Sequence, residues 1–268
     1  MHKNNNNVFS IAQTEKFMMY SEEKRDYQIF LHTPDTPAPE EGYPVLYLLD
    51  ANAIFGSVVE ALRMEEYTYA RYEPAAVVGI GYPTDKPYDF ERRFFDYTIH
   101  ATNDESPEGM KLPEVGGADP FLQFIEQQLK PAIAQRIPVN HNRQAIFGHS
   151  LGGFFALHTL FHHPECFQTY IAGSPSLWWK NRYLLENLED SCSKLSQQSQ
   201  QKNLYLAIGS EELSFMVEDA ATMYDRLASK NLPCLNIDYK LFEGEGHISI
   251  FHPLIRRALD FFLRKKDR

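Results

Sequence analysis

The sequence has few cysteines and no long hydrophobic run, and each shortage excludes a class of protein. Its 268 residues include three cysteines, Cys166, Cys192 and Cys234, an odd number without the spacing of a metal site. We therefore expect reduced thiols in a cytoplasmic protein, with no disulfide framework and no bound metal. No apolar run approaches the roughly 20 residues that a membrane-spanning helix needs, so we expect no membrane segment.

Basic residues are also scarce relative to acidic ones. There are 26 Lys and Arg residues against 36 Asp and Glu, a net charge of -10. Nucleic-acid binding needs a positive field, so nucleic acid is excluded as the expected partner. A chain of this length can bury a core without disulfides or metals. We expect one globular domain over residues 1–268, with the polar, Asn-rich residues 1–7 disordered.

Short apolar runs alternate with segments long enough for a helix. Residues 17–20 and 26–32 alternate around a polar turn and predict an N-terminal antiparallel hairpin. The other predicted strands are residues 45–49, 75–80, 144–147, 169–172, 204–208 and 235–242. The predicted helices are residues 53–72, 119–136, 152–162, 217–229 and 253–265. This order predicts an α/β fold, with a mostly parallel central sheet and helices on both faces.

Two stretches interrupt this alternation. Residues 100–117 form a polar loop with Pro and Gly, longer than most connections in a compact domain, so a functional role such as a lid and simple mobility both remain open. Residues 190–202 are rich in Ser and Gln and are expected to be a helix end and a loop.

The strongest chemical signal is Gly-x-Ser-x-Gly at residues 148–152, between a predicted strand and a predicted helix. A serine nucleophile has to project its hydroxyl from a sharp strand-to-helix turn. We expect Gly148 and Gly152 to remove side chains that would collide there. The following helix directs its free N–H groups toward a developing oxyanion. Ser150 is therefore the predicted nucleophile.

A serine nucleophile needs a base and an acid that orients the base, in the chain order Ser, Asp or Glu, His. His247 lies in a Gly-rich loop after the last predicted strand, and it is the predicted base. Glu212 and Glu211 follow the preceding strand; we prefer Glu212 as the acid and keep Glu211 as the alternative. Asp219 is expected to be a surface charge. The other histidines near these segments, expected to have packing, surface or capping roles, are His149, His158, His162, His163 and His252.

The oxyanion needs two backbone donors. Leu151 N–H, at the start of the helix after the nucleophile, is the first. The second should follow an early parallel strand, where we expect Asn52 N–H, with Ala51 as the alternative. This chemistry requires neither a metal nor an organic cofactor.

With these residues assigned, the chain resembles a known family. The segments that carry the resemblance are GYPVLYLLDAN (42–52), RRFFDYT (92–98), GGAD (116–119), FGHSLGG (147–153) and GSPSLWW (173–179). Together they are similar to the esterase branch of the α/β-hydrolases, and within it to the esterases of ferric-siderophore trilactones such as bacillibactin, enterobactin and salmochelin. The chain departs from that pattern at Ala51, where Gly is usual, and at Ile99, where Pro is common.

The resemblance implies a substrate with aromatic rings and several negative charges, the ferric complex of a catecholate siderophore. Such a substrate needs cations, for which Arg92 and Arg93 are candidates, although they could instead pair with Asp96 or Glu91. It also needs flat apolar surfaces. Trp178 and Trp179 could supply them or could pack beneath a loop. A chain of net charge -10 repels a polyanion, so this substrate demands a local positive patch.

The prediction is a serine esterase of the α/β-hydrolase fold that hydrolyses a siderophore trilactone through an acyl-enzyme and releases its iron. One alternative is a general carboxylesterase, thioesterase or feruloyl-type esterase that shares the triad. The other is a non-catalytic binding member of the same fold.

Overall fold

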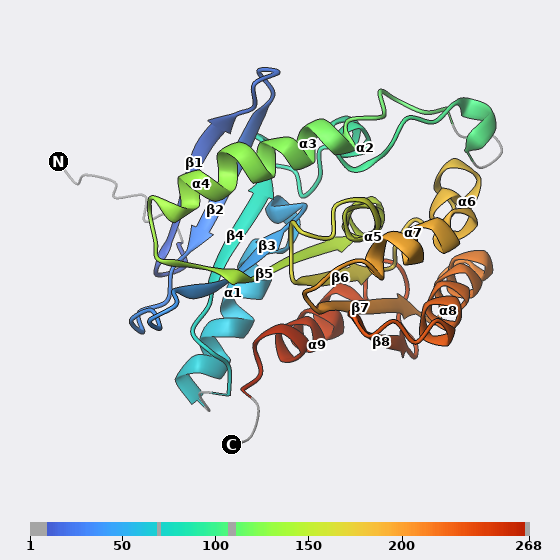
Figure 1. The fold of residues 1–268 in the computed structure, drawn as a ribbon. Coiled ribbons are helices and arrows are strands. Elements are labelled where there is room, and N and C mark those ends of the chain that lie inside the picture. Colours follow the sequence, from blue (N-terminus) through green and yellow to red (C-terminus); the bar gives the residue numbers. More distant parts are fainter. Residues whose placement is uncertain (1–9, 69–70, 107–110, 266–268) are drawn as a thin grey trace.

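A computed structural model describes residues 10–68, 71–106 and 111–265, and its centre is one twisted sheet (Figure 1). The sheet has eight strands in the order β1-β2-β4-β3-β5-β6-β7-β8. The predicted disorder of residues 1–7 lies outside the described residues. For those that are described, no helix is long and apolar enough to cross a membrane.

The strands agree with the predicted pattern. The hairpin of β1 (Thr14–Tyr20) and β2 (Asp26–His32) is antiparallel and continues antiparallel onto β4. All pairings from β4 through β8 are parallel. The bounds of the remaining strands are β3 Tyr43–Leu48, β4 Ala76–Gly81, β5 Val139–His149, β6 Thr169–Gly173, β7 Lys202–Gly209 and β8 Leu235–Phe242. The predicted α/β fold, with its mostly parallel sheet and N-terminal hairpin, is confirmed.

Helices cover both faces of the sheet, because successive side chains of a strand point to opposite faces. In β3 and just after it, Val45, Tyr47 and Leu49 join one apolar cluster, while Leu46 and Leu48 join a second. The second cluster is covered by α1 (Ala51–Thr68) and α9 (Phe251–Leu263). The helices that bury side chains in the first cluster are α2 (Phe90–Tyr97), α3 (Ala118–Phe124), α4 (Lys130–Ala134), α5 (Leu151–His162), α6 (Trp179–Glu186), α7 (Leu188–Leu195) and α8 (Ser214–Ser229).

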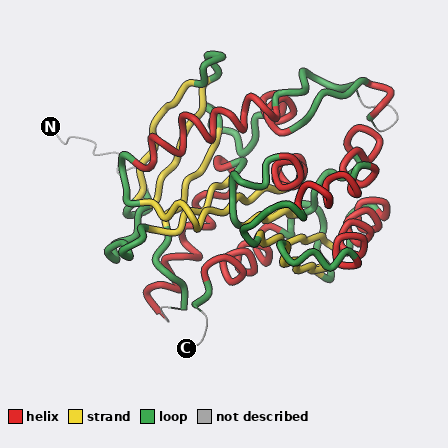
Figure 2. The backbone as a smooth tube through the Cα atoms, in the orientation of Figure 1, coloured by secondary structure: helices red, strands yellow, loops and turns green. Residues whose placement is uncertain are grey.

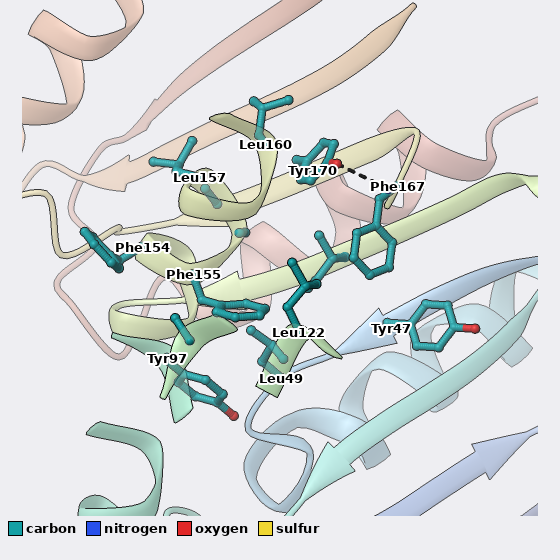
Figure 3. Packing of buried hydrophobic residues seen from close by; sticks show 14 of the residues in the cluster. Tyr47, Leu49, Tyr97, Leu122, Phe154, Phe155, Leu157, Leu160, Phe167 and Tyr170 are labelled. Carbon is teal, nitrogen blue, oxygen red and sulfur yellow. Dashed lines mark hydrogen bonds between the residues drawn. The ribbon is translucent and has the colours of Figure 1, made fainter. Parts of the chain in front are cut away.

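The central helix α5 is buried along nearly its whole length. Phe154, Phe155, Leu157 and Leu160 have no exposed surface and pack with residues of the sheet and of neighbouring helices (Figure 3). Each such side chain stabilises the fold by about 1.5–3 kcal/mol relative to exposure. The first turn of α5 is therefore held rigidly at the end of β5.

Two helices were not expected from the sequence, and a third was expected only as a helix end within residues 190–202. The first, α2, has Asp89 as its N-cap, whose side chain accepts a hydrogen bond from Arg92 N at 3.1 Å. The others are α6, which opens with residues 180–182 in the left-handed region, and α7, which overlaps the predicted helix end. The single helix expected over residues 119–136 is α3 and α4 joined by a π-helical turn, Ile125–Leu129.

The predicted long loop connects α2 to α3 and contains one short 3₁₀ helix, Asn103–Glu105. Figure 2 shows this loop, in green, extending beyond the two helices that it joins. Residues 107–110 within it lie outside the described part, and a lid function stays a prediction.

The chain after α9 is attached to the segment before β4. Tyr72 and Arg264 form an isolated antiparallel bridge. On either side of it, Glu73 N donates to Leu263 O at 3.1 Å and Lys265 N donates to Arg71 O at 3.0 Å. The end of the last helix is thus fixed against the middle of the chain.

Candidate active site

The carboxyl ends of the parallel strands meet at one edge of the sheet, and the predicted catalytic residues follow them directly. Ser150 follows β5, Glu212 lies beyond β7, and His247 lies beyond β8. Strands that run parallel place such loops side by side. The fold therefore collects these residues although they are far apart in the sequence.

Ser150 occupies the sharp turn between β5 and α5. Its backbone has φ 60 and ψ −119, a conformation that residues with a side chain rarely adopt. Its N–H donates to Gly173 O at 2.9 Å, which ties the turn to β6. Its hydroxyl lies 3.4 Å from Ser176 Oγ. Both Ser150 and His247 are among the described residues, and no hydrogen bond of 3.5 Å or less joins them.

The glycines of the turn contribute differently from the prediction. A Cβ on Gly148 would lie 2.0 Å from Gly152 O, so a side chain there is excluded. A Cβ on Gly152 would meet Leu49 Cδ1 at 3.4 Å, an ordinary contact, so the predicted collision at Gly152 is wrong. The second close approach involves Gly153, whose Cβ would lie 2.8 Å from Gly173 O.

His247 and Glu212 form a close pair. Nδ1 of His247 lies 2.6 Å from Oε2 of Glu212, whose side chain is fully buried. The other oxygen, Oε1, accepts hydrogen bonds from Ser174 Oγ and, at 3.1 Å, from Gly209 N. Glu211, the alternative acid, is exposed. The structure thus brings Glu212 to the imidazole.

The hydrogen bonds keep Glu212 ionised. Burial alone would raise its pKa, but the hydrogen bonds from His247, Ser174 and the backbone outweigh burial, so its pKa lies below the usual value. A carboxylate in this state fixes the Nδ1–H tautomer of the imidazole and leaves Nε2 free to accept a proton.

His149 lies against the predicted base. Its ring centroid is 4.6 Å from that of His247 and 4.2 Å from that of Phe251. Burial lowers the pKa of His149 well below its usual value, and the nearby His247 and Arg93 lower it further, so the ring is neutral. Because His149 precedes Ser150 directly, this contact places the serine turn and His247 on the same side of the molecule.

The predicted oxyanion donors begin two helices. Leu151 is the first residue of α5 and Asn52 the second of α1, and N–H groups of a first helical turn have no intrahelical acceptor. The Asn52 side chain attaches this turn to the end of β4: its Nδ2 donates to Tyr82 O at 2.9 Å, and its Oδ1 accepts from Tyr82 N at 2.8 Å.

The two arginines are engaged in ion pairs. Nε and Nη2 of Arg93 donate to both Asp50 oxygens, at 3.0 and 2.9 Å, and both side chains are buried. Asp50 is the residue with φ 51 directly before α1, so Arg93 holds the turn of residues 50–52, where an oxyanion donor is predicted. Arg92 instead binds Asp26 Oδ1 at 2.8 Å and lies 4.0 Å from Asp96 Oδ2.

The two tryptophans differ in exposure. Trp179 is fully buried, and its Nε1 donates to Ile99 O at 3.1 Å. Trp178 is half-buried and packs at the edge of the first apolar cluster. Of the pair, Trp178 alone has surface that a substrate could touch.

Two residues of the site had no role assigned from the sequence. Ser174 and Ser176 both lie in the GSPS segment after β6, one bonded to Glu212 and the other near Ser150. Their position between the nucleophile strand and the acid strand was the available signal. Asp219, expected as a surface charge, is buried and binds Arg182 Nε at 2.7 Å, so that prediction is wrong.

The part of the chain that the structure describes has no group of three or more His, Cys, Asp or Glu side chains placed to hold a metal ion. His158, for which a packing, surface or capping role is predicted, is buried, and its Nε2 lies 3.3 Å from Asp119 Oδ1. The functional groups that the structure brings to this edge of the sheet are a serine, an imidazole and a carboxylate.

This fold, with its serine turn and the Glu–His pair at the same edge, defines an ester-hydrolysing enzyme of the α/β-hydrolase fold. The family described as "Putative esterase" matches residues 21–248. The chain belongs to this family.

Named relatives extend over nearly the whole chain. This chain is 42% identical to the ferri-bacillibactin esterase BesA of Bacillus subtilis (strain 168) over 266 residues. The alignment covers 96% of this chain and 92% of that protein. The crystal structure of the BES protein from Bacillus cereus superposes with a TM-score of 0.91 at 36% identity, covering 96% of this chain and 98% of that one. The siderophore hydrolase EstA from Aspergillus nidulans gives a TM-score of 0.80 at 30% identity. The superposition covers 95% of this chain and 97% of that one.

Proposed function

We propose that this protein is a serine esterase that hydrolyses the ester bonds of a siderophore trilactone through an acyl-enzyme. The observation that carries the proposal is the 2.6 Å pair of His247 Nδ1 and Glu212 Oε2 at the sheet edge where Ser150 occupies its turn. The substrate class is supported by the names of relatives that match nearly the whole chain, a ferri-bacillibactin esterase and a siderophore hydrolase.

In the first half of the reaction, Ser150 Oγ attacks the ester carbonyl while its proton passes to His247 Nε2. For this step the Ser150 hydroxyl turns away from Ser176 and forms a hydrogen bond with His247. Catalytic hydrogen bonds commonly shorten in this way when substrate binds. The N–H groups of Leu151 and Asn52 stabilise the oxyanion. The tetrahedral intermediate then collapses, the C–O bond of the ester breaks, and His247 gives its proton to the leaving alcohol.

In the second half, water attacks the acyl-enzyme. His247 takes a proton from the water, and the intermediate releases the carboxylic acid and restores Ser150. Glu212 stays ionised throughout and stabilises the imidazolium. Any iron in this reaction belongs to the substrate.

Arg92, Arg93 and Trp178 are the proposed substrate contacts, whereas Trp179 was predicted as one but has no exposed surface. The ion pairs of both arginines favour a second candidate, an esterase whose preferred ester carries no charge, because each guanidinium is already matched by a carboxylate. The half-buried Trp178 suits either substrate, since an aromatic face can stack on a catechol ring or cover an acyl chain.

We further propose that the chain is a single domain and acts in the cytoplasm. All eight strands join one sheet, which supports one domain. The three cysteines carry free thiols, which suits a reducing compartment.

The test compares kcat/KM for ferric and iron-free trilactones with that for simple neutral esters, using the wild type and Ser150→Ala. We expect the variant to lose turnover by about 10³-fold or more on every ester, with an unchanged Tm. The wild type should prefer trilactones. A preference for simple esters would support the second candidate, and full activity of Ser150→Ala would overturn the serine mechanism.

A further inference from the structure

Ser174 follows β6 in a constrained backbone position. It has φ 43, its residue surface is fully buried, and its N–H donates to Ala207 O at 2.7 Å in the neighbouring strand β7. A buried residue in the left-handed region is uncommon unless it is glycine. The hydrogen bond to β7 therefore fixes the backbone that carries this hydroxyl.

That hydroxyl donates to Glu212 Oε1, the oxygen that does not face the imidazole. Gly209 N donates to the same oxygen at 3.1 Å, and His247 Nδ1 lies 2.6 Å from Oε2. The Glu212 side chain has no exposed surface, so water does not replace any of these donors. The orientation of the carboxylate is set by the protein alone.

We propose that Ser174 is a positioning residue for the hydrolysis, acting through Glu212. The terminal torsion of a glutamate has a broad energy profile, so a carboxylate held from one side only can rotate. Two donors on Oε1 stop that rotation and keep Oε2 directed at His247 Nδ1. This inference rests on the proposed function, because it assigns a task within the same triad.

A residue that acts in this way changes kcat and leaves KM unaltered. Ser174 is fully buried and cannot touch the substrate, so its loss leaves substrate binding intact. Misalignment of the imidazole slows proton transfer. We expect Ser174→Ala to lower kcat by about 10-fold, the size of effect that one hydrogen bond to a charged group can have on a rate.

The backbone at Ser174 requires a second variant. Serine already carries the strain of φ 43 and alanine retains it, whereas glycine adopts this φ freely, so Ser174→Gly removes the hydroxyl together with the strain. If the hydroxyl matters, Ser174→Gly and Ser174→Ala lose kcat to a similar extent. Wild-type kcat in Ser174→Gly would overturn the proposal, because the hydroxyl is absent from that variant.

A double-mutant cycle with Glu212→Gln separates positioning from general damage. If Ser174 acts through Glu212, adding Ser174→Gly to Glu212→Gln costs little further kcat. An additive loss would overturn the proposal. Ser191→Ala is the matched control, because Ser191 is also buried and donates to a backbone oxygen, Asn187 O at 3.0 Å, away from the site. It should keep wild-type kcat.

The pH profile gives an independent readout. A carboxylate that loses a donor becomes more basic and binds the imidazolium more strongly, so the acid limb of kcat/KM in Ser174→Gly should move to higher pH. If Ser174→Gly moves neither the acid limb of the profile nor kcat, the positioning role of Ser174 is refuted and the proposed triad is unaffected. If Glu212→Gln also has no effect, the proposed triad itself fails, and the two failures are distinguishable.

Discussion

At the scale of single residues, Glu212 and Asp96 are both buried carboxylates whose neighbours give them opposite properties. Hydrogen bonds overcome the effect of burial at Glu212 and lower its pKa. At Asp96 burial dominates over the nearby Arg92 and raises the pKa to about 6. Its Oδ1 accepts from Tyr27 at 3.2 Å, whereas Oδ2 has no hydrogen-bond partner in the described part of the chain. Asp96 is both more deeply buried and served by fewer donors than Glu212, and both differences raise its pKa relative to that of Glu212.

Replacing Glu212 by Gln tests the acid of the triad. An amide cannot stabilise the imidazolium and can favour the wrong tautomer, so kcat should fall by roughly 10²-fold or more with little change in KM. Steady-state kinetics on one trilactone measures the effect. Glu211→Gln is the adjacent control, exposed to solvent, and should keep wild-type kinetics. A larger loss in Glu211→Gln would reverse the assignment.

The raised pKa of Asp96 makes folding stability depend on pH. Between the unfolded value near 3.8 and the folded value of about 6, the native state binds more protons, so the free energy of unfolding falls as pH rises. Relative to Asp96→Asn, the wild type should lose about 2 kcal/mol between pH 4 and pH 7. Urea unfolding at each pH measures this difference.

An exposed aspartate serves as the comparison for that experiment. Asp225 lies on the outer surface of α8, and Asp225→Asn should follow the wild-type profile. A constant difference between wild type and Asp96→Asn across pH 4 to 7 would mean that Asp96 titrates as an ordinary surface group.

At the scale of elements, α2 is distant in the sequence from the turn of residues 50–52, where an oxyanion donor is predicted, and yet it holds that turn in place. Arg93 binds both oxygens of Asp50, and the hydroxyl of Tyr97 accepts a hydrogen bond from Asp50 N at 3.1 Å. Two residues one helical turn apart on α2 thus hold the residue that precedes α1. The position of the Asn52 N–H group depends on this contact between α2 and the turn.

Replacing Arg93 by Lys tests that dependence. Lysine keeps the charge but cannot form the two-pronged bond, so kcat/KM should fall by about 10-fold on a ferric trilactone and on a neutral ester alike. A selective loss on the ferric trilactone would assign Arg93 to the substrate. Arg63→Lys, on the half-exposed surface of α1, should leave both rates unchanged.

The turn between β5 and α5 offers a matched pair of glycine substitutions. Gly148→Ala places a methyl group 2.0 Å from Gly152 O, so the turn has to open, at a cost of about 2 kcal/mol or more. Gly152→Ala meets only an ordinary contact and gains helix propensity, so its stability should be unchanged or up to about 1 kcal/mol higher. Thermal unfolding compares the two, and equal losses would contradict the argument.

Local patterns predicted most of the strands, because alternation and buried apolar runs are properties of neighbouring residues. The order along the chain also indicated which loops hold Ser150, Glu212 and His247. What the sequence did not predict depends on contacts between distant segments. Arg93 and Asp50 are 43 residues apart, and nothing near either one signals the other. The helix α2 offered its Asp89 cap and an amphipathic pattern, but it is only eight residues long.

At the scale of the whole molecule, the net charge of -10 acts on any anionic substrate. Arg92 and Arg93 each form an ion pair with an aspartate, so neither supplies an unpaired positive charge for an anionic substrate. Salt weakens long-range repulsion, because the screening length shortens from about 30 Å at 0.01 M to about 10 Å at 0.1 M ionic strength. The rate of encounter with a polyanion should therefore depend on salt.

We expect kcat/KM for a ferric tris-catecholate trilactone to rise when ionic strength increases from 0.01 to 0.1 M, by about 2-fold or more. A neutral ester measured in parallel should show no change. A fall in kcat/KM for the trilactone would instead demonstrate an attractive local patch that outweighs the overall charge.

The bridge between Tyr72 and Arg264 has a practical consequence for handling the protein. Because the backbone on both sides of Arg264 is paired with the segment before β4, an exopeptidase acting from the carboxyl end should stall near Lys265. Trimming by such an enzyme would leave α9, and the His247 loop that leads into it, in place. A purification tag removed by carboxypeptidase digestion is therefore compatible with an intact enzyme.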